Sequence, residues 1–162
     1  MSMFMINCVL MVCSLFLVAS CASNPVASKA DDAIAKSFNV PSDKSVVYVY
    51  RERSASALMM SMRMLNLNLD GRYNRALDNS TFHRFELKPG EHFCVAQVTY
   101  DSGTIAGALP GELEFNTEAG EIYFIEVKER WETPLNNGIA IKLQSEVTGK
   151  SEISSRTLAR RR

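Results

Sequence analysis

The stretch 64-MLNLNLDG-71 indicates the fold class, because leucine and polar residues alternate along it without interruption. Successive side chains of an extended chain point to opposite sides. The leucines therefore share one side and the polar residues the other: Leu65, Leu67 and Leu69 against Asn66, Asn68 and Asp70. This alternation predicts a β-strand that is buried on one face only. Gly71 tolerates the positive φ that a hairpin requires, so Asp70–Gly71 predicts a tight turn after the strand.

Six more stretches are rich in β-branched and aromatic residues or alternate in the same way, which predicts strands at 45–53, 81–87, 92–100, 112–117, 121–130 and 138–147. Pro89–Gly90 and Ala119–Gly120 supply turns between members of this series. Short strands at this spacing predict an all-β fold, namely an antiparallel β-sandwich of seven to eight strands.

A short N-terminal helix is expected before the first strand. Ser28 can cap it, Asp31 and Asp32 suit its positive end, and Lys36 suits its negative end. The helix should run for about ten residues and end before Pro41.

The charges balance, with 18 basic and 18 acidic residues, and residues 1–20 contain none of them. The body of the chain is therefore neutral, which gives no electrostatic reason to expect nucleic acid as a partner. Residues 149–162 end in a basic stretch with Arg156, Arg160, Arg161 and Arg162. Such a tail is typical of solvated, flexible chain ends, and contact with anionic lipid head groups is the alternative.

The N-terminal residues 3–19 are nearly all apolar, and small residues follow them up to Cys21. A run of about 17 residues is at the lower limit for crossing a bilayer, and its small-residue end is typical of a cleaved signal peptide. Residues 18–21 (VASC) resemble a lipobox, the signal of bacterial lipoproteins, in which the cysteine is acylated and becomes the new N-terminus. One departure is that residues 1–7 contain no Lys or Arg, so an uncleaved signal anchor is the alternative.

The lipobox resemblance implies a lipid anchor at Cys21, with fatty acyl chains such as palmitate holding the protein on the membrane. Ala22 follows the cysteine where an Asp would imply retention in the inner membrane, which implies the outer membrane and a domain that faces the periplasm. The expected division is a signal peptide at 1–20, a lipidated tether at 21–29, a β-sandwich domain at 30–148 and the basic tail at 149–162.

Four segments occur in an order that resembles a known family: 46–51 (VVYVYR), 67–77 (LNLDGRYNRAL), 85–92 (FELKPGEH) and 119–127 (AGEIYFIEV). Together with the small helix, they resemble the bacterial lipoprotein domain called domain of unknown function 2846, over roughly 30–146. The resemblance implies a β fold, but it brings no established activity and no catalytic residue. The stretches 54–62 and 101–111 match none of these segments and are candidates for what is particular to this protein.

Hydrolytic catalysis needs a nucleophile, a base and an orienting group, and the chain has only two histidines. His92 follows a turn that it is expected to hold, and His83 shares a strand face with Phe85 and Leu87. Cys94 is expected to pack as a small apolar residue. Hydrolase, metalloprotease, phosphate-loop and dinucleotide motifs are not found in the sequence. We therefore expect neither an enzyme nor a bound cofactor.

Three methionines at alternate positions, Met60, Met62 and Met64, fall on the Asn66 side if the strand register extends backward. Plain packing after a bulge, a protein-contact surface and thioether binding of Cu(I) all remain as interpretations. Trp131 ends a strand beside charged residues and is expected either to pack or to contact a partner or ligand.

Two carboxylate pairs, Glu112 with Glu114 and Glu126 with Glu129, lack the spacing of a calcium loop, so we expect them on solvated strand faces. The sequence as a whole predicts a lipid-anchored, periplasm-facing envelope lipoprotein that acts as a non-enzymatic interaction or structural module, with the membrane and an unidentified envelope protein as partners. The alternative is a small-ligand or copper-binding module that uses the methionines or a pocket near Trp131.

Overall fold

A computed structural model describes residues 26–53, 63–71, 73–100, 109–133 and 136–160. The elements in these ranges are α2 (Lys29–Ala35), β1 (Ser45–Arg51), β2 (Arg63–Leu69), β3 (Tyr73–Leu77), β4 (Thr81–Leu87), β5 (Gly90–Tyr100), β6 (Gly111–Thr117), β7 (Ile122–Thr133), β8 (Asn136–Gln144), α4 (Glu146–Ser154) and β9 (Thr157–Leu158). The protein is therefore mostly β, as the sequence predicts. Two of the strands, β3 and β9, are additional to the stretches expected from the sequence.

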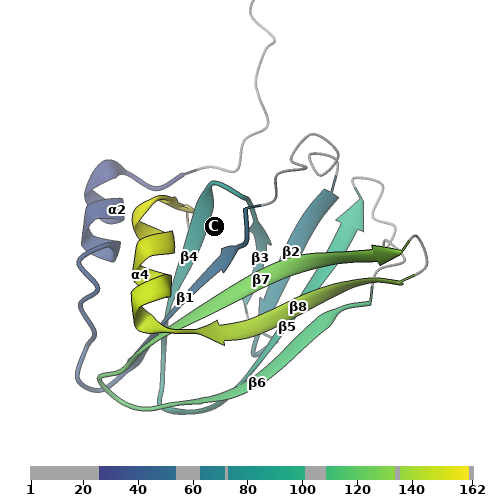
Figure 1. The fold of residues 1–162 in the computed structure, drawn as a ribbon. Coiled ribbons are helices and arrows are strands. Elements are labelled where there is room, and N and C mark those ends of the chain that lie inside the picture. The colour runs from purple at the N-terminus through teal and green to yellow at the C-terminus, as the bar shows by residue number, and fades with distance from the viewer. Residues whose placement is uncertain (1–25, 54–62, 72, 101–108, 134–135, 161–162) are drawn as a thin grey trace, which may run out of the picture.

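The strands form two sheets, a five-stranded one in the order β8-β7-β1-β4-β9 and a four-stranded one in the order β3-β2-β5-β6 (Figure 1). Most neighbours are antiparallel, but β1 pairs with β7 and β4 pairs with β9 in parallel. The expectation of a purely antiparallel sandwich is therefore wrong for these two pairs. A parallel pair needs a long connection, and the strands between β1 and β7 in the chain, four of which make the second sheet, supply it.

The main core lies between the two sheets. The three leucines of β2, Leu65, Leu67 and Leu69, are fully buried there, which confirms the alternation read from the sequence. They meet residues of the five-stranded sheet that include Val47, Val49, Ile125 and Val127. Burial of this alternating apolar face is the main force that holds the sheets together.

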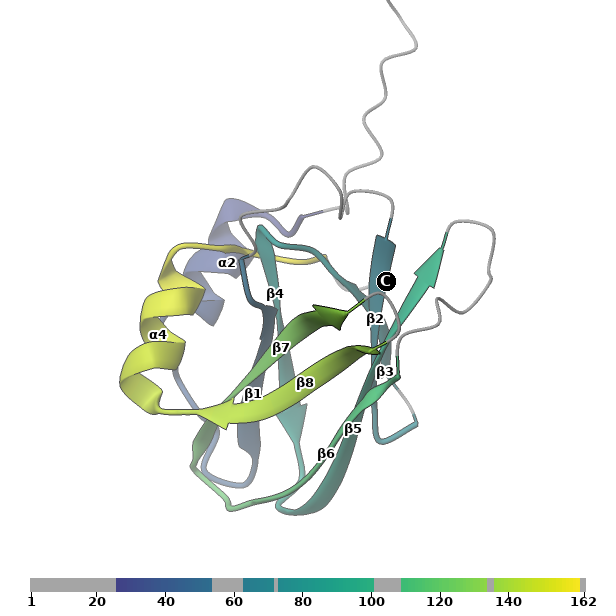
Figure 2. The ribbon, with the colours of Figure 1, turned by 45° about the vertical axis from the view of Figure 1, so that its right-hand side comes forward.

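A second core covers the opposite face of the five-stranded sheet. Tyr48, Phe82 and Phe124 of the sheet pack there with Ala35 of α2 and Ile153 of α4. Figures 1 and 2 show both helices on this outer side, so the domain has a helical layer, a five-stranded layer and a four-stranded layer. Every residue of β1 is buried because this strand has core on both of its faces. Helix α2 starts as predicted, with the Ser28 hydroxyl accepting the Asp31 N–H at 3.1 Å.

The expected flexible tail at 149–162 is wrong for residues 149–160. Ser145 caps α4, and after the helix Arg156 is only 2% exposed, followed by β9 on the edge of β4. The domain also begins earlier than position 30, because Val26 forms a β-bridge with Ala159. The cluster of arginines suggested a solvated end, whereas Ile153 and Arg156 anchor the segment on β1 and only Arg160 among its described arginines is exposed.

None of the helices within the described ranges is long and apolar enough to cross a membrane.

Candidate functional site

One edge of the five-stranded sheet is only partly covered. Strand β4 pairs with β1 from Phe82 to Leu87, but on its other side β9 pairs only with Thr81 and Phe82. The last contact is the Ala159 N–H, which donates to the Phe82 carbonyl at 2.9 Å. From His83 to Leu87, no strand of the described ranges pairs with this outer edge. Unpaired strand edges present main-chain donors and acceptors to whatever approaches them.

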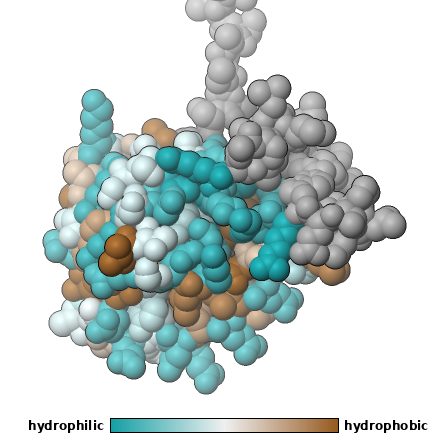
Figure 3. Space-filling view, in the orientation of Figure 1, coloured by the Kyte–Doolittle hydropathy of each residue, from teal (hydrophilic) through white to brown (hydrophobic). Residues whose placement is uncertain are grey.

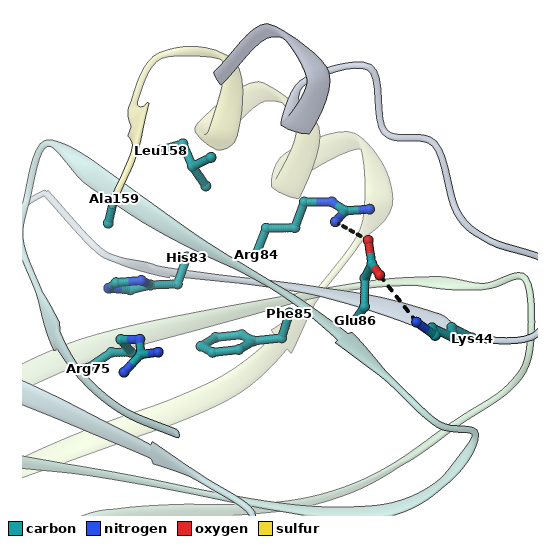
Figure 4. Close-up of a pocket in the computed structure, with 8 residues that line it drawn as sticks. All are labelled: Lys44, Arg75, His83, Arg84, Phe85, Glu86, Leu158 and Ala159. Atoms are coloured by element: carbon teal, nitrogen blue, oxygen red, sulfur yellow. Dashed lines mark hydrogen bonds and ion pairs between the residues drawn. The ribbon is translucent and has the colours of Figure 1, made fainter. Parts of the chain in front are cut away.

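A groove of about 210 Å³ follows this edge, and we call it the β4-edge groove (Figure 4). His83 and Phe85 extend to one side of the strand, toward Arg75 of β3, while Arg84 and Glu86 extend to the helix side. The complete lining consists of Lys44, Arg75, His83, Arg84, Phe85, Glu86, Leu158 and Ala159.

The helix side of the groove is a network of charged side chains around Glu86. Arg84 donates to the Glu86 carboxylate at 2.6 Å, and the Lys44 ammonium lies 3.5 Å from its other oxygen. Arg84 also donates to the Asn39 carbonyl at 3.1 Å, which fixes the guanidinium. The hydrogen bond from Arg84 lowers the pKa of Glu86, so this carboxylate is ionised at neutral pH. Three cationic side chains and one carboxylate line the groove, which leaves it with a net formal charge of +2.

His83 closes the other side. The residue is 7% exposed, and its Nε2 lies 2.8 Å from the Ala76 carbonyl of β3, to which the N–H form of this nitrogen donates. Burial lowers the pKa of His83, so the imidazole is neutral at neutral pH. The ring lies 6.1 Å from that of Phe85. His83 therefore links the edges of the two sheets, as expected of a structural histidine.

His92 holds a turn, which confirms its predicted role. Its Nδ1 lies 2.8 Å from a carboxylate oxygen of Asp70, and its Nε2 lies 2.9 Å from the Lys88 carbonyl. The other oxygen of Asp70 accepts the Phe93 N–H at 3.0 Å, and Asp70 has a positive φ of 55°. The Asp70–Gly71 turn is thereby tied to the start of β5.

Cys94 is fully buried in the core between the sheets, and burial raises the pKa of its thiol to about 12. A thiol with so high a pKa is neutral and unreactive at neutral pH. The prediction that Cys94 packs as a small apolar residue is confirmed.

The carboxylate pairs differ from each other. Glu112 and Glu114 are both exposed on β6, as expected. The side chains of Glu126 and Glu129 are only 10% and 4% exposed, which contradicts the expectation of a solvated face. Glu126 accepts from Gln144 at 3.0 Å, and Glu129 pairs with Arg51. Within the described ranges, no group of three or more His, Cys, Asp or Glu side chains is arranged to hold a metal ion.

The side chains predicted for lipidation and for partner or metal contacts lie outside the part of the chain that the structure describes. Cys21, Met60 and Met62 lie outside the described residues. Met64 pairs with Thr99 of β5 and Trp131 pairs with Asn137 of β8, but their side chains are outside the described part. Their proposed contacts remain predictions.

Sequence reasoning missed the β4-edge groove. The stretch 81-TFHRFEL-87 predicts a strand with two different faces, and the charged Arg84 and Glu86 are a signal that edge strands often carry. The position of β4 next to a strand of only two residues depends on contacts with distant parts of the chain.

A second groove, of about 680 Å³, adjoins the first between α2 and β9 and shares Arg84, Leu158 and Ala159 with it. Its rim includes Val26 and Ile34, which are 52% and 70% exposed. Val26, the first residue that the structure describes, therefore lies at this groove. Hydrophilic side chains make up most of the face shown in Figure 3, and the apolar ones stand in small groups.

Comparisons with known proteins give a family and no activity. The family model described as "Protein of unknown function (DUF2846)" matches residues 41–139. None of the curated proteins matches the chain. A solved structure described as "NMR structure of the protein from Eubacterium rectale" is similar with 9% identity and a TM-score of 0.34, over 65% of this chain and 93% of that one. A similarity at this level carries no argument about the fold or the function.

Proposed function

The chain belongs to the DUF2846 family of proteins of unknown function, and we propose that it is a lipid-anchored envelope lipoprotein whose β domain acts as a non-enzymatic interaction module. In this proposal Cys21 carries the lipid in the outer membrane, and the domain faces the periplasm. The partner is another protein of the envelope.

The lipobox-like residues 18–21 (VASC) carry the proposal, and the position at which the chain enters the domain indicates which side a lipid would hold near the membrane. Val26 forms a bridge with Ala159, and the Ala27 N–H donates to the Leu158 carbonyl at 2.9 Å, so the chain is fixed to the domain there. Cys21 precedes Val26 by five residues, which span at most about 18 Å when fully extended. A lipid on Cys21 would therefore hold the α2 and β9 end of the domain beside the membrane surface.

The arrangement of the reactive side chains supports a non-enzymatic role. Both imidazoles hydrogen-bond to main-chain carbonyls, His83 to Ala76 and His92 to Lys88. Cys94 is buried with a neutral thiol. These three groups stabilise turns, sheet edges and the core.

Lipidation is tested by expressing the full chain in a bacterium with radiolabelled palmitate, followed by mass spectrometry and separation of inner and outer membranes on a density gradient. We expect loss of residues 1–20, an acyl mass on Cys21 and recovery with the outer membrane. Cys21→Ser should lose the label, whereas the matched control Cys13→Ser, which changes a cysteine of the signal peptide, should keep it. A Cys21→Ser protein that remains anchored with the mass of the unchanged chain would refute the proposal.

A further inference from the structure

The outer edge of β4 presents main-chain groups at every second residue. The carbonyls of Ser80 and Phe82 point outward, since they accept the N–H groups of Thr157 and Ala159. Alternate residues of a strand direct their main-chain groups to the same side. The N–H and C=O groups of Arg84 and Glu86 therefore also point outward, beyond the end of β9.

The two sides of the edge favour different side chains. On the helix side, Arg84 and Lys44 surround Glu86 and leave a positive charge. On the other side, Phe85 and the neutral ring of His83 form an apolar wall beside the guanidinium of Arg75. Side chains of an added strand alternate between two faces, so acidic and apolar residues in alternation would meet the matching sides.

The charge of the groove favours an acidic occupant, because three cationic side chains and one carboxylate line it. An acidic segment is complementary to the groove, and this complementarity speeds association and disfavours basic competitors.

We propose that the β4-edge groove binds an extended acidic peptide segment of a partner protein. The segment pairs with β4 past the point where β9 ends, and so adds a strand to the five-stranded sheet. The inference rests on the proposed role as an interaction module and names the kind of partner, but it does not depend on the lipid anchor. Up to four main-chain hydrogen bonds, from the N–H and C=O groups of Arg84 and Glu86, give the added strand its register.

A pair of variants at position 86 separates strand addition from simple charge attraction. Glu86→Pro removes the outward N–H, and the bonds between β4 and β1 remain because residue 86 does not direct its N–H toward β1. Glu86→Gln removes the same negative charge and keeps the N–H. Both variants make the groove more positive by the same charge, so loss of binding in Glu86→Pro alone is not an effect of charge.

The probe is a fluorescent six-residue peptide that alternates glutamate with valine, titrated by anisotropy against the full chain purified in detergent. We expect saturable binding, with at least about tenfold weaker binding when lysine replaces glutamate in the peptide. Binding should weaken at least about tenfold in Glu86→Pro and stay equal or become tighter in Glu86→Gln. Thermal unfolding of each variant checks that the domain remains folded.

The inference is overturned if the glutamate peptide does not bind at millimolar concentration, if the lysine peptide binds equally well, or if folded Glu86→Pro and Glu86→Gln bind alike. Its failure is distinct from failure of the anchor. Missing palmitate on Cys21 would refute the lipoprotein proposal while peptide binding persisted, and an acylated protein without peptide binding would refute the groove alone.

Discussion

Replacement of Arg156 by methionine should lower the free energy of unfolding by about 3 kcal/mol. The guanidinium is buried between α4 and β1, where it donates to the Arg51 carbonyl at 2.8 Å and to the Glu152 carbonyl at 2.8 Å. It also pairs with the Glu152 carboxylate and lies 4.8 Å from the centre of the Tyr50 ring. Methionine keeps most of the volume and loses every one of these polar contacts.

The magnitude follows from the groups that lose their contact with the guanidinium. A buried Arg51 carbonyl without its donor costs about 2 kcal/mol, and loss of a desolvated cation–π contact with Tyr50 costs about 1–2 kcal/mol. The ion pair with Glu152 adds under about 1 kcal/mol, because that carboxylate is 39% exposed and water can replace the arginine. Arg156 Nε is a buried donor without a partner among the described residues, so its removal stabilises the folded state by about 1 kcal/mol. The net loss is a large share of the roughly 5–15 kcal/mol that stabilises a domain.

Urea unfolding of a soluble chain that starts at Val26 measures the effect, since both core clusters lie within it. For a slope of about 2 kcal/mol per molar urea, the midpoint should fall by about 1.5 M. Arg160→Met is the matched control, because Arg160 belongs to the same basic end but is exposed, and its effect should stay below about 0.5 kcal/mol. A loss below about 1 kcal/mol for Arg156→Met, or equal losses for both variants, would refute the assignment of Arg156 as a structural residue.

Two further predictions concern packing and pH. Gly149→Ala should destabilise the domain by about 1–3 kcal/mol in thermal unfolding, although alanine favours a helix, because an added Cβ would overlap the Phe124 ring. Ser151→Ala, at an exposed position of the same helix, is the control. An unchanged or higher melting temperature for Gly149→Ala would contradict the packing. Burial lowers the pKa of His83 from its ordinary value of 6.5, so below that pH the unfolded chain binds a proton that the folded chain does not. The stability contributed by the neutral ring is complete above pH 6.5 and is lost as the pH falls below it, by at most about 1.4 kcal/mol per pH unit. His83→Asn should flatten this part of the curve of unfolding free energy against pH, and parallel curves for the two proteins would contradict the prediction.

The strands could be predicted where local pattern decides them. The alternation around Leu67 fixes which side chains of β2 are buried, and the Pro89–Gly90 and Ala119–Gly120 turns mark strand ends. The parallel pairing of β1 with β7 could not be predicted, because it depends on which distant strands meet and not on either segment alone. Helix α4 (EVTGKSEIS) was missed because it contains a glycine and several residues of low helix propensity, and its packing on Phe124 requires that glycine.

The site was harder to predict for the same reason. His83, His92 and Cys94 have the structural roles that their local surroundings suggested. The buried Glu129 was misread, because its partner Arg51 is a distant residue of β1. The β4-edge groove exists because β9 covers only two residues of the seven-residue strand β4. The sequence of β4 alone does not indicate how long its neighbouring strand is.

The anchor and the groove have a geometric relation that restricts the partner. The chain enters the domain at Val26, on the groove between α2 and β9, and this groove shares Arg84, Leu158 and Ala159 with the β4-edge groove. If Cys21 carries the lipid, the tether of about 18 Å keeps this side of the domain near the membrane. A membrane-embedded or membrane-bound protein can then present the acidic segment close to the same membrane. A freely diffusing periplasmic protein is disfavoured, because it would have to enter the narrow space between the domain and the bilayer. Lengthening the tether with a flexible insert before Val26 should leave peptide affinity unchanged in detergent, and it should reduce crosslinking between Glu86 and a membrane-bound partner that carries the segment.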